Sequence, residues 1–325
     1  MSTEIICLNN LNITEWSEFL LSAKNSSVFN TVEWAKVWES SFPNMTPVFI
    51  LWREDKIQAG IPLMKISKFG FNSYYSMPYG GYGSILLSNN NKEKANELIH
   101  HLSCFTKGRW GIIELVDFYN ELEGYMGGFN RDRRITHILP LLPNSQEVWE
   151  KSINPKTRNK ISQAQKKGIT VSIVESENEI KECYKMREDT IKRHEVSTNY
   201  LPLKFYLALF DEMKNYLRWT IAYKDNQALA YAIHFVYKDT IIWWDNSSYT
   251  SALQYRPNNA LIWEAIKWGC ENGYKYYNLG GSPSEGLIKF KESWGADEKV
   301  YWAYYKKSKV FSFLKHLQEI FKFNV

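Results

Sequence analysis

The chain has 325 residues, of which 44% are hydrophobic and 23% charged, and its formal net charge is +5. This profile is typical of a folded protein with a sizeable core, and it excludes a collagen-like or disordered chain. The four cysteines form no CxxC pair, so we expect reduced thiols, no disulfide framework and no metal site.

The first half of the chain predicts two helices followed by strands. Asn12 or Thr14 can cap the first helix, and Thr31 can cap the second. The expected elements of this half are helices ending near residues 21 and 39, a hairpin over 48–64, a glycine-rich strand region over 79–87, a helix over 92–105 and a strand over 112–116.

The second half repeats this order about 170 residues later, since the turn at Asp55 corresponds to the turn at Asp225. Its expected elements are helices over 177–192 and 202–215, strands over 217–223, 228–236 and 241–244, a helix over 257–271 and a strand over 276–279. Each half therefore predicts a strand, two helices, a three-stranded meander, then helix, strand, helix and strand. This order indicates two copies of one α/β (α+β) unit, each a mixed, largely antiparallel sheet flanked by helices.

A basic segment separates the two halves. Helical spacing places Lys156, Lys160 and Lys167 near one face of it. Such a run is either a solvated face or a surface that contacts phosphates. We expect an N-terminal domain over 1–143, a basic helical connector over 144–168, and a C-terminal domain over 169–325. The last domain would end in an amphipathic helix over 309–323, which either packs on that domain or makes peripheral membrane contact.

The segment from Tyr276 to Tyr305 carries the strongest candidate for chemistry. A strand runs through Gly280-Gly281 into a helix that contains Lys291. Backbone N–H groups, a helix N-terminus and one ammonium in one crevice would stabilise a developing oxyanion, as acyl transfer requires. The alternative is a glycine turn followed by a solvated lysine.

Several segments in this order resemble the Fem-type nonribosomal aminoacyl transferases of cell-wall precursor synthesis. The segments that carry the resemblance are Glu33-Trp34-Ala35-Lys36-Val37, Thr157-Arg158-Asn159-Lys160-Ile161, Lys192-Arg193-His194-Glu195-Val196, Tyr255-Arg256-Pro257, Tyr277-Asn278-Leu279-Gly280-Gly281, and Phe290-Lys291 with Trp294-Gly295. The resemblance covers nearly the whole chain. It implies two tandem domains with the acetyltransferase-like GNAT fold, which agrees with the repeat.

The resemblance also implies roles for two neighbouring residues in catalysis. Lys291 matches the family's lysine that is thought to stabilise the tetrahedral oxyanion, and Phe290 would be a wall that excludes water. Without the resemblance, Phe290 is an ordinary core residue.

Five more residues match family positions. Lys36 and Arg193 match contacts to the phosphates of a nucleotide- or lipid-linked muramyl peptide. Asp117 matches an acidic position that receives or orients the attacking amine's proton. Tyr255 and Arg256 match acceptor contacts at the start of a helix. Without the resemblance, Lys36 and Arg193 are surface residues of helices.

We therefore expect an acyltransferase without a metal or bound cofactor, whose donor is aminoacyl-tRNA. The alternative is an acyl-CoA-dependent N-acyltransferase acting on a polysaccharide or amino-sugar precursor. The loop over 254–259 contains no glycine and includes Pro257, which argues against the usual cradle for the CoA pyrophosphate. A third hypothesis is an inactive transferase scaffold that binds RNA through the basic connector.

The N-terminal sequence lacks a basic start followed by an apolar stretch, so we expect no secretion signal and a cytoplasmic protein. No uninterrupted apolar run approaches the roughly 20 residues of a membrane span.

Overall fold

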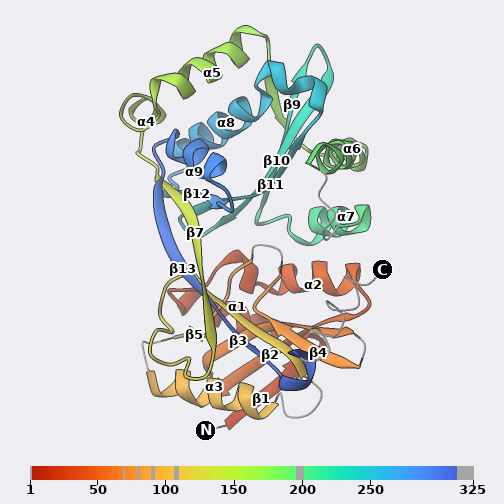
Figure 1. Cartoon of the computed structure of the whole chain (residues 1–325), viewed down its shortest axis with the longest axis vertical. Coiled ribbons are helices and arrows are strands. Elements are labelled where there is room, and N and C mark those ends of the chain that lie inside the picture. Colours follow the sequence, from red (N-terminus) through yellow and green to blue (C-terminus); the bar gives the residue numbers. More distant parts are fainter. Residues whose placement is uncertain are drawn as a thin grey trace, which may run out of the picture. The chain divides into compact units, whose positions relative to one another are not determined.

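The computed structural model describes residues 2–68, 70–78, 81–88, 92–105, 110–194 and 201–312. The chain divides into two compact units, one formed by residues 1–134 and 301–325 and the other by residues 135–300. Two strands, β7 (Asn130–Pro140) and β13 (Asp297–Lys307), each run from one unit into the other (Figure 1).

The first unit is a sheet with the strand order β1-β2-β3-β4-β6-β13. Neighbouring strands are antiparallel except β4 and β6, which are parallel. The elements of this unit are β1 (Ser2–Cys7), η1 (Leu8–Asn10), α1 (Ile13–Ser22), η2 (Val28–Asn30), α2 (Val32–Ser41), β2 (Met45–Arg53), β3 (Ile57–Lys68), β4 (Phe71–Tyr75), β5 (Leu86–Leu87), α3 (Lys92–Phe105) and β6 (Trp110–Asp117).

Side chains of β2 point alternately to the two faces of this sheet, and both faces are buried. Val48 and Ile50 join a core cluster with residues of α3, whereas Phe49 and Leu51 join a cluster with residues of α1 and α2. This two-residue period is the reason that α3 and the α1–α2 pair cover opposite faces. The expected caps are confirmed in part, since the Asn12 side chain accepts from Glu15 N and the Thr31 side chain from Trp34 N.

The second unit repeats this arrangement with the strand order β7-β12-β11-β10-β9-β8. Its strands are antiparallel except β11 and β12, which are parallel. The elements of this unit are α4 (Ser145–Lys151), α5 (Pro155–Lys166), β8 (Thr170–Ile173), α6 (Glu177–His194), α7 (Leu203–Glu212), β9 (Leu217–Lys224), β10 (Gln227–Tyr237), β11 (Thr240–Ser248), η3 (Thr250–Tyr255), α8 (Pro257–Glu271), β12 (Tyr276–Gly281) and α9 (Glu285–Glu292).

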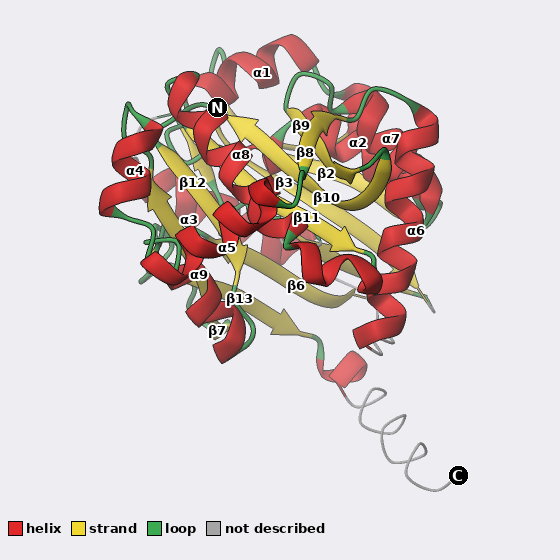
Figure 2. Ribbon diagram, turned by 90° about the horizontal axis from the view of Figure 1, so that it is seen from above, coloured by secondary structure: helices red, strands yellow, loops and turns green. Residues whose placement is uncertain are grey.

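Helix α8 packs across β8, β9, β10 and β11, and Figure 2 shows it lying over these strands. Helix α6 packs on β10 and β11 from the opposite face and also contacts α7 (Figure 1). Side chains of β10 alternate between the two faces of the sheet, which explains why α8 and α6 pack on opposite faces. Ala230 and Ala232 join a core cluster with Leu261 of α8, while Tyr231 between them bonds Asp245 on the side of α6.

The expected α/β repeat is confirmed, with additional helices in the second copy. Helices α4 and α5 precede β8, and α9 lies between β12 and β13, whereas residues 118–129 between β6 and β7 form turns. Positive φ angles at Asn120, Gly124 and Gly128 interrupt any helix there.

The division into units differs from the expected boundaries of 1–143, 144–168 and 169–325. Helices α4 and α5 are not a separate connector, because Val148, Ile153 and Ile161 are buried in the core of the second unit. Residues 302–307 of β13 pair with β6 in the first unit, so the second unit ends before them. Most of the expected terminal helix over 309–323, from residue 313 onward, lies outside the described residues.

In the part of the chain that the structure describes, no helix is both long enough and apolar enough to span a bilayer.

Candidate active site

The Lys291 side chain is held against the glycine-rich end of β12. Ser284 caps the start of α9, its side chain accepting from Leu287 N, and Lys291 lies in the last turn of the helix. From there, Nζ donates to the carbonyl oxygens of Gly280 at 2.7 Å and Gly281 at 2.5 Å. The ammonium therefore bonds two backbone carbonyl groups, and the expected crevice shared with backbone N–H groups and a helix N-terminus stays a prediction.

Burial shapes the charge of this lysine. Its side chain is only 4% exposed, and burial lowers the pKa of the Lys291 ammonium to about 8. Two of its three N–H groups are used by the glycine carbonyls, and the third has no acceptor among the residues that the structure describes. A lysine with this pKa is still mostly charged near neutral pH, so it can stabilise a negative charge that develops beside it.

An irregular stretch of β12 presents the two carbonyls. The register between β12 and β7 shifts between Asn278 and Gly281. Across this shift the Thr136 hydroxyl lies 2.6 Å from Asn278 Oδ1 and 2.8 Å from the Gly280 oxygen, and Gly280 N donates to Asn278 Oδ1 at 3.0 Å. Gly280 has φ +77°, and a Cβ there would lie 2.9 Å from the Trp243 carbonyl oxygen. Only glycine fits this conformation and this space.

A histidine–serine pair lies beside the lysine. His137 follows Thr136 on β7 and is fully buried, and its Nδ1 lies 2.8 Å from Ser282 Oγ. Burial and the nearby charge of Lys291 both lower the pKa of His137, which keeps the imidazole neutral at pH 7. This pair was not among the residues predicted from the sequence. The only signal was a Thr-His step within a strand that is otherwise apolar on its buried face.

Aromatic rings lie close together near the end of the β11–β12 pairing. These two parallel strands pair only from Thr240 to Ile242 on β11, and beyond Ile242 the strand β11 pairs with β10 alone, up to Ser248. The Phe290 ring lies 6.4 Å from the Trp243 ring and 6.3 Å from the Trp294 ring. Phe290 is half-buried against the core, a position that fits either a core residue or a water-excluding wall.

Asp117 lies in the first unit, at the end of β6, and is fully buried. Its Oδ2 accepts from Leu122 N at 2.8 Å, so the carboxylate organises the turn that follows the strand. Burial raises the pKa of Asp117. The described contact of Asp117 is therefore one that stabilises the fold. Its predicted role, to receive or orient the proton of the attacking amine, stays a prediction.

The predicted phosphate-binding residues differ in how free they are. Lys36 is half-buried on α2, and no hydrogen bond or ion pair is formed by it within the described part of the chain. Arg193 is held in place, because its Nη1 donates to Ser248 O at 3.2 Å and to Thr250 Oγ1 at 3.0 Å and lies 3.5 Å from Asp189. Arg193 thus ties α6 to the segment after β11.

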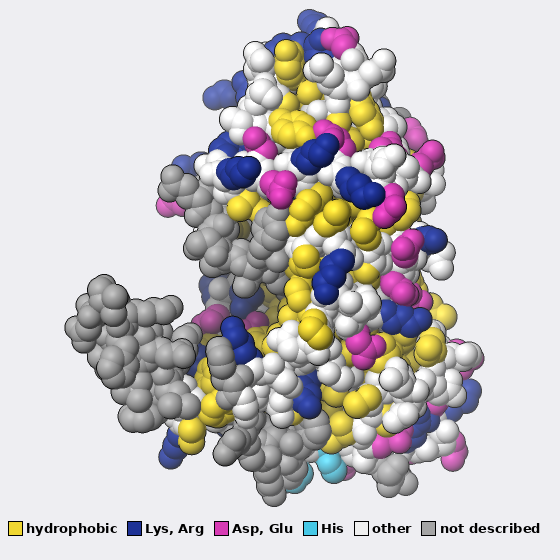
Figure 3. Space-filling model, turned by 90° about the vertical axis from the view of Figure 1, so that its right-hand side faces the viewer, with side chains coloured by type: hydrophobic (Ala, Val, Ile, Leu, Met, Phe, Trp, Pro, Cys, Tyr) yellow, Lys and Arg dark blue, Asp and Glu magenta, His cyan; other side chains and the backbone are white. Residues whose placement is uncertain are grey.

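Tyr255 and Arg256 precede α8. The Tyr255 ring lies 5.8 Å from Lys167 Nζ and 5.5 Å from Lys224 Nζ, and Lys167 Nζ donates to Gln254 O at 2.7 Å. Arg256 is exposed and has φ +61°. This corner is basic, which suits an anionic ligand. On the face shown in Figure 3, by contrast, acidic and basic side chains are interspersed.

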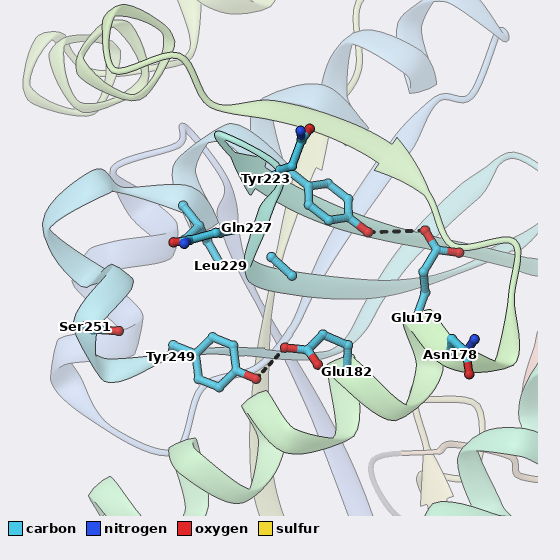
Figure 4. A pocket seen from close by; sticks show the side chains of 10 residues that line it. Asn178, Glu179, Glu182, Tyr223, Gln227, Leu229, Tyr249 and Ser251 are labelled. Atoms are coloured by element: carbon cyan, nitrogen blue, oxygen red, sulfur yellow. Dashed lines mark hydrogen bonds between the residues drawn. The ribbon is translucent and has the colours of Figure 1, made fainter.

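The second unit also contains a pocket of about 540 Å³ that sequence analysis did not predict. Figure 4 shows Tyr223 pointing to Glu179 and Tyr249 pointing to Glu182, with hydroxyl-to-carboxylate distances of 3.2 Å and 2.6 Å. The Tyr249 hydrogen bond lowers the pKa of Glu182. The carboxylates of Glu179 and Glu182 thus already accept hydrogen bonds from tyrosine hydroxyls. The three-residue spacing of these two glutamates on α6 was the sequence signal for the pocket.

No group of three or more His, Cys, Asp or Glu side chains is arranged to hold a metal ion in the described ranges.

Comparison with known proteins identifies the fold. Residues 155–292 match the family model "Acetyltransferase (GNAT) domain". No curated protein sequence matches the chain. A crystal structure of FemX aligns with a TM-score of 0.75 at 15% identity, covering 98% of this chain and 99% of that one.

Two further solved structures have the same fold. The structure of L-PGS from Bacillus licheniformis gives a TM-score of 0.60 at 13% identity and covers 91% of this chain and 92% of that one. A tandem GNAT protein from the clavulanic acid biosynthesis pathway gives 0.56 at 11% identity, with coverages of 94% and 98%. The expected Fem-type, tandem GNAT-like fold is confirmed, and the family model covers β12, α9 and Lys291.

Proposed function

We propose that this chain, an acyltransferase with the GNAT-like fold of FemX, moves an aminoacyl group from aminoacyl-tRNA to an amine of a cell-wall precursor. The acceptor would be a nucleotide- or lipid-linked muramyl peptide. The fold likeness to FemX over 98% of the chain supports this proposal, and so does the likeness to L-PGS. The sequence segments that resemble those of Fem-type enzymes are in accord with it.

The observation that carries the proposal is the buried Lys291 ammonium, fixed by the carbonyls of Gly280 and Gly281. The amine of the acceptor attacks the ester carbonyl of the donor, and the carbonyl oxygen gains negative charge. The third N–H of Lys291 donates to that oxygen. Collapse of the intermediate breaks the C–O bond, the ribose oxygen leaves with a proton, and the attacking nitrogen loses one. Phe290 and Trp243 exclude water from this step.

Lys36 and Arg193 are proposed to contact the acceptor's phosphates, with Tyr255 and Arg256 as further contacts. Lys36 has no partner of its own in the described part of the chain. Arg193 already donates to Ser248 and Thr250, so its part would be smaller. Lys36 is therefore the better candidate for an anion contact.

An acyl-CoA donor is the second candidate, and the name of the matching family model favours it. The loop before α8 opposes it. Arg256 caps that helix without a side-chain hydrogen bond, and Pro257 removes one N–H from its first turn.

The test incubates the protein with a uridine-diphosphate muramyl pentapeptide and either alanyl-tRNA, seryl-tRNA, glycyl-tRNA or acetyl-CoA, with products read by mass spectrometry. We expect a mass gain of one aminoacyl residue with a charged tRNA. Lys291→Ala is expected to lower turnover by about 10²- to 10³-fold, as loss of one oxyanion donor does. Lys289→Ala is the matched control, because Lys289 is exposed on the same helix.

Product from acetyl-CoA alone would favour the second candidate. Absence of any product, or full turnover by Lys291→Ala, would contradict the proposal.

A further inference from the structure

The His137–Ser282 pair lies next to the carbonyls that hold Lys291. Gly281 and Pro283 are exposed, whereas Ser282 between them is 6% exposed. Ser282 is fixed there because its backbone N–H donates to Ile135 O at 3.2 Å. The Ser282 hydroxyl is thus turned toward β7, where His137 lies 2.8 Å away.

The burial of His137 decides which group donates in this hydrogen bond. A neutral imidazole carries one N–H, on either Nδ1 or Nε2. In the described part of the chain, His137 Nε2 has no hydrogen-bond partner. A proton on Nε2 would therefore be a buried donor without an acceptor, which proteins strongly avoid. With the proton on Nδ1, the donor is satisfied by Ser282 Oγ, and only a lone pair remains on Nε2.

The nearby ammonium keeps the ring neutral, because the charge of Lys291 opposes a positive imidazole. The neutral ring carries a single N–H, and the unpartnered Nε2 places it on Nδ1. His137 Nδ1 thus donates to Ser282 Oγ.

This direction leaves the hydroxyl proton of Ser282 unused. His137 is the sole hydrogen-bond partner of Ser282 Oγ within the residues that the structure describes. The preceding residue, Gly281, presents its carbonyl to Lys291 Nζ at 2.5 Å. Lys291 thus bonds the residue that precedes Ser282, and neither the Ser282 O–H nor the third N–H of Lys291 has an acceptor among the described residues.

We propose that Ser282 is a second catalytic hydrogen-bond donor to the oxyanion, and that His137 is the positioning residue that aims its hydroxyl. This inference rests on the proposed acyl transfer. Two donors at about hydrogen-bond distance from one oxygen form an oxyanion hole, in which each bond strengthens as the carbonyl oxygen gains charge. The Ser282 hydroxyl is not a nucleophile in this scheme, because the same lysine charge that keeps His137 neutral opposes its action as a base.

The kinetic test uses the donor and acceptor that give product in the screen above. Ser282→Ala is expected to lower kcat about 10- to 100-fold with an unchanged KM, since the hydroxyl acts on the transition state. Ser172→Ala, which removes an exposed serine hydroxyl on β8, is the control and should leave kcat unchanged. A kcat of Ser282→Ala equal to that of the wild type, with Lys291→Ala inactive, overturns this inference and leaves the proposed function standing.

Substitutions of His137 separate positioning from packing. The amide nitrogen of Asn reaches the place of Nδ1, so His137→Asn should keep most of the activity, whereas His137→Leu should lose as much as Ser282→Ala. The double variant His137→Leu/Ser282→Ala should be no slower than Ser282→Ala alone. Additive losses, with both single variants fully folded by circular dichroism, would overturn the positioning role.

A spectroscopic measurement tests the tautomer without any substrate. Long-range ¹⁵N–¹H spectra of the histidine-labelled protein, with His137 assigned through the His137→Asn variant, should show a protonated Nδ1 and a bare Nε2. A protonated Nε2 would mean that Ser282 donates to His137, and the proposal would fail. If the wild type transfers no acyl group from any donor, the proposed function falls and this inference with it.

Discussion

Thr157 Oγ1 donates to Ser293 Oγ at 2.8 Å, which ties the first turn of α5 to the end of α9. Asn154 N donates to Ser293 O at 3.1 Å beside it. The segment that was expected to be a separate connector therefore fixes the end of the helix that carries Lys291. Thr157 is buried, so its hydroxyl has no water as a substitute partner.

We predict that Thr157→Val destabilises the protein by about 1 kcal/mol, the usual worth of one buried hydrogen bond. Thr170→Val, at an exposed position of β8, should change stability little. Urea denaturation followed by tryptophan fluorescence measures both. Equal stability of the two variants would show that the Thr157–Ser293 bond contributes nothing.

The pH dependence of turnover should report Lys291. Its pKa is lowered from 10.5 to about 8 by burial, so the ammonium is lost as pH rises through about 8. If the charged form stabilises the oxyanion, kcat should fall above that pH. A pH–rate profile that stays flat from pH 7 to 10 would argue against an acting ammonium.

Stability should change in the opposite direction over nearly the same range. The unfolded chain holds the proton up to pH 10.5, whereas the folded chain releases it near pH 8. Between these values the unfolded state binds more protons, so the free energy of unfolding should rise with pH by up to about 3 kcal/mol relative to Lys291→Met. Urea titrations of both proteins at pH 7.5 and 10 test this difference.

Two glycines near the lysine should respond in opposite ways to a methyl group. Gly280→Ala should destabilise the protein by about 1–3 kcal/mol, because φ is +77° and the new Cβ would meet Trp243 O at 2.9 Å. Gly286→Ala meets no atom within 4 Å in α9 and should stabilise it by about 0.5–1 kcal/mol. Thermal unfolding gives both values, and a neutral Gly280→Ala would show that the bulge tolerates a side chain.

Acid should destabilise the fold through His234. This side chain is fully buried with Nε2 2.8 Å from Tyr277 Oη, and burial lowers its pKa from 6.5 to about 3. The unfolded state takes up a proton below pH 6.5 and the folded state does not. The free energy of unfolding should therefore fall by about 1.4 kcal/mol per pH unit toward pH 3. The variant His234→Gln cannot titrate at this position. The fall in its free energy of unfolding between pH 7 and 4, measured by denaturation, should therefore lack the contribution of His234.

Lys36 should affect acceptor binding and leave the chemical step unchanged. Loss of one charge-assisted contact to a phosphate predicts that Lys36→Gln raises the acceptor KM about tenfold with kcat unchanged. Arg193→Gln is the comparison, and because Arg193 is already bonded within the fold its main loss should be in stability. Steady-state kinetics that gave Lys36→Gln a wild-type KM would remove Lys36 from the acceptor site.

Local signals in the sequence predicted the elements well, because a helix cap such as Asn12 or Thr31 acts within three residues. The repeat was also visible, since matching turns recur at a fixed spacing. The pairing of β13 with β6 could not be predicted from the sequence, because partners nearly 190 residues apart leave no local pattern. Lys291 was chosen from its motif, but its carbonyl partners depend on a register shift between β7 and β12. The same shift explains why His137 and Ser282 were missed.

The last strand of each repeat completes the sheet of the other, since β7 pairs with β12 and β13 with β6. A gene fragment that encodes one repeat alone would leave an open sheet edge with unpaired backbone groups, which favours aggregation. The two repeats are therefore expected to fold only together. Neither repeat has a closed sheet without a strand from its sibling, so truncation at residue 143 would yield no autonomous half.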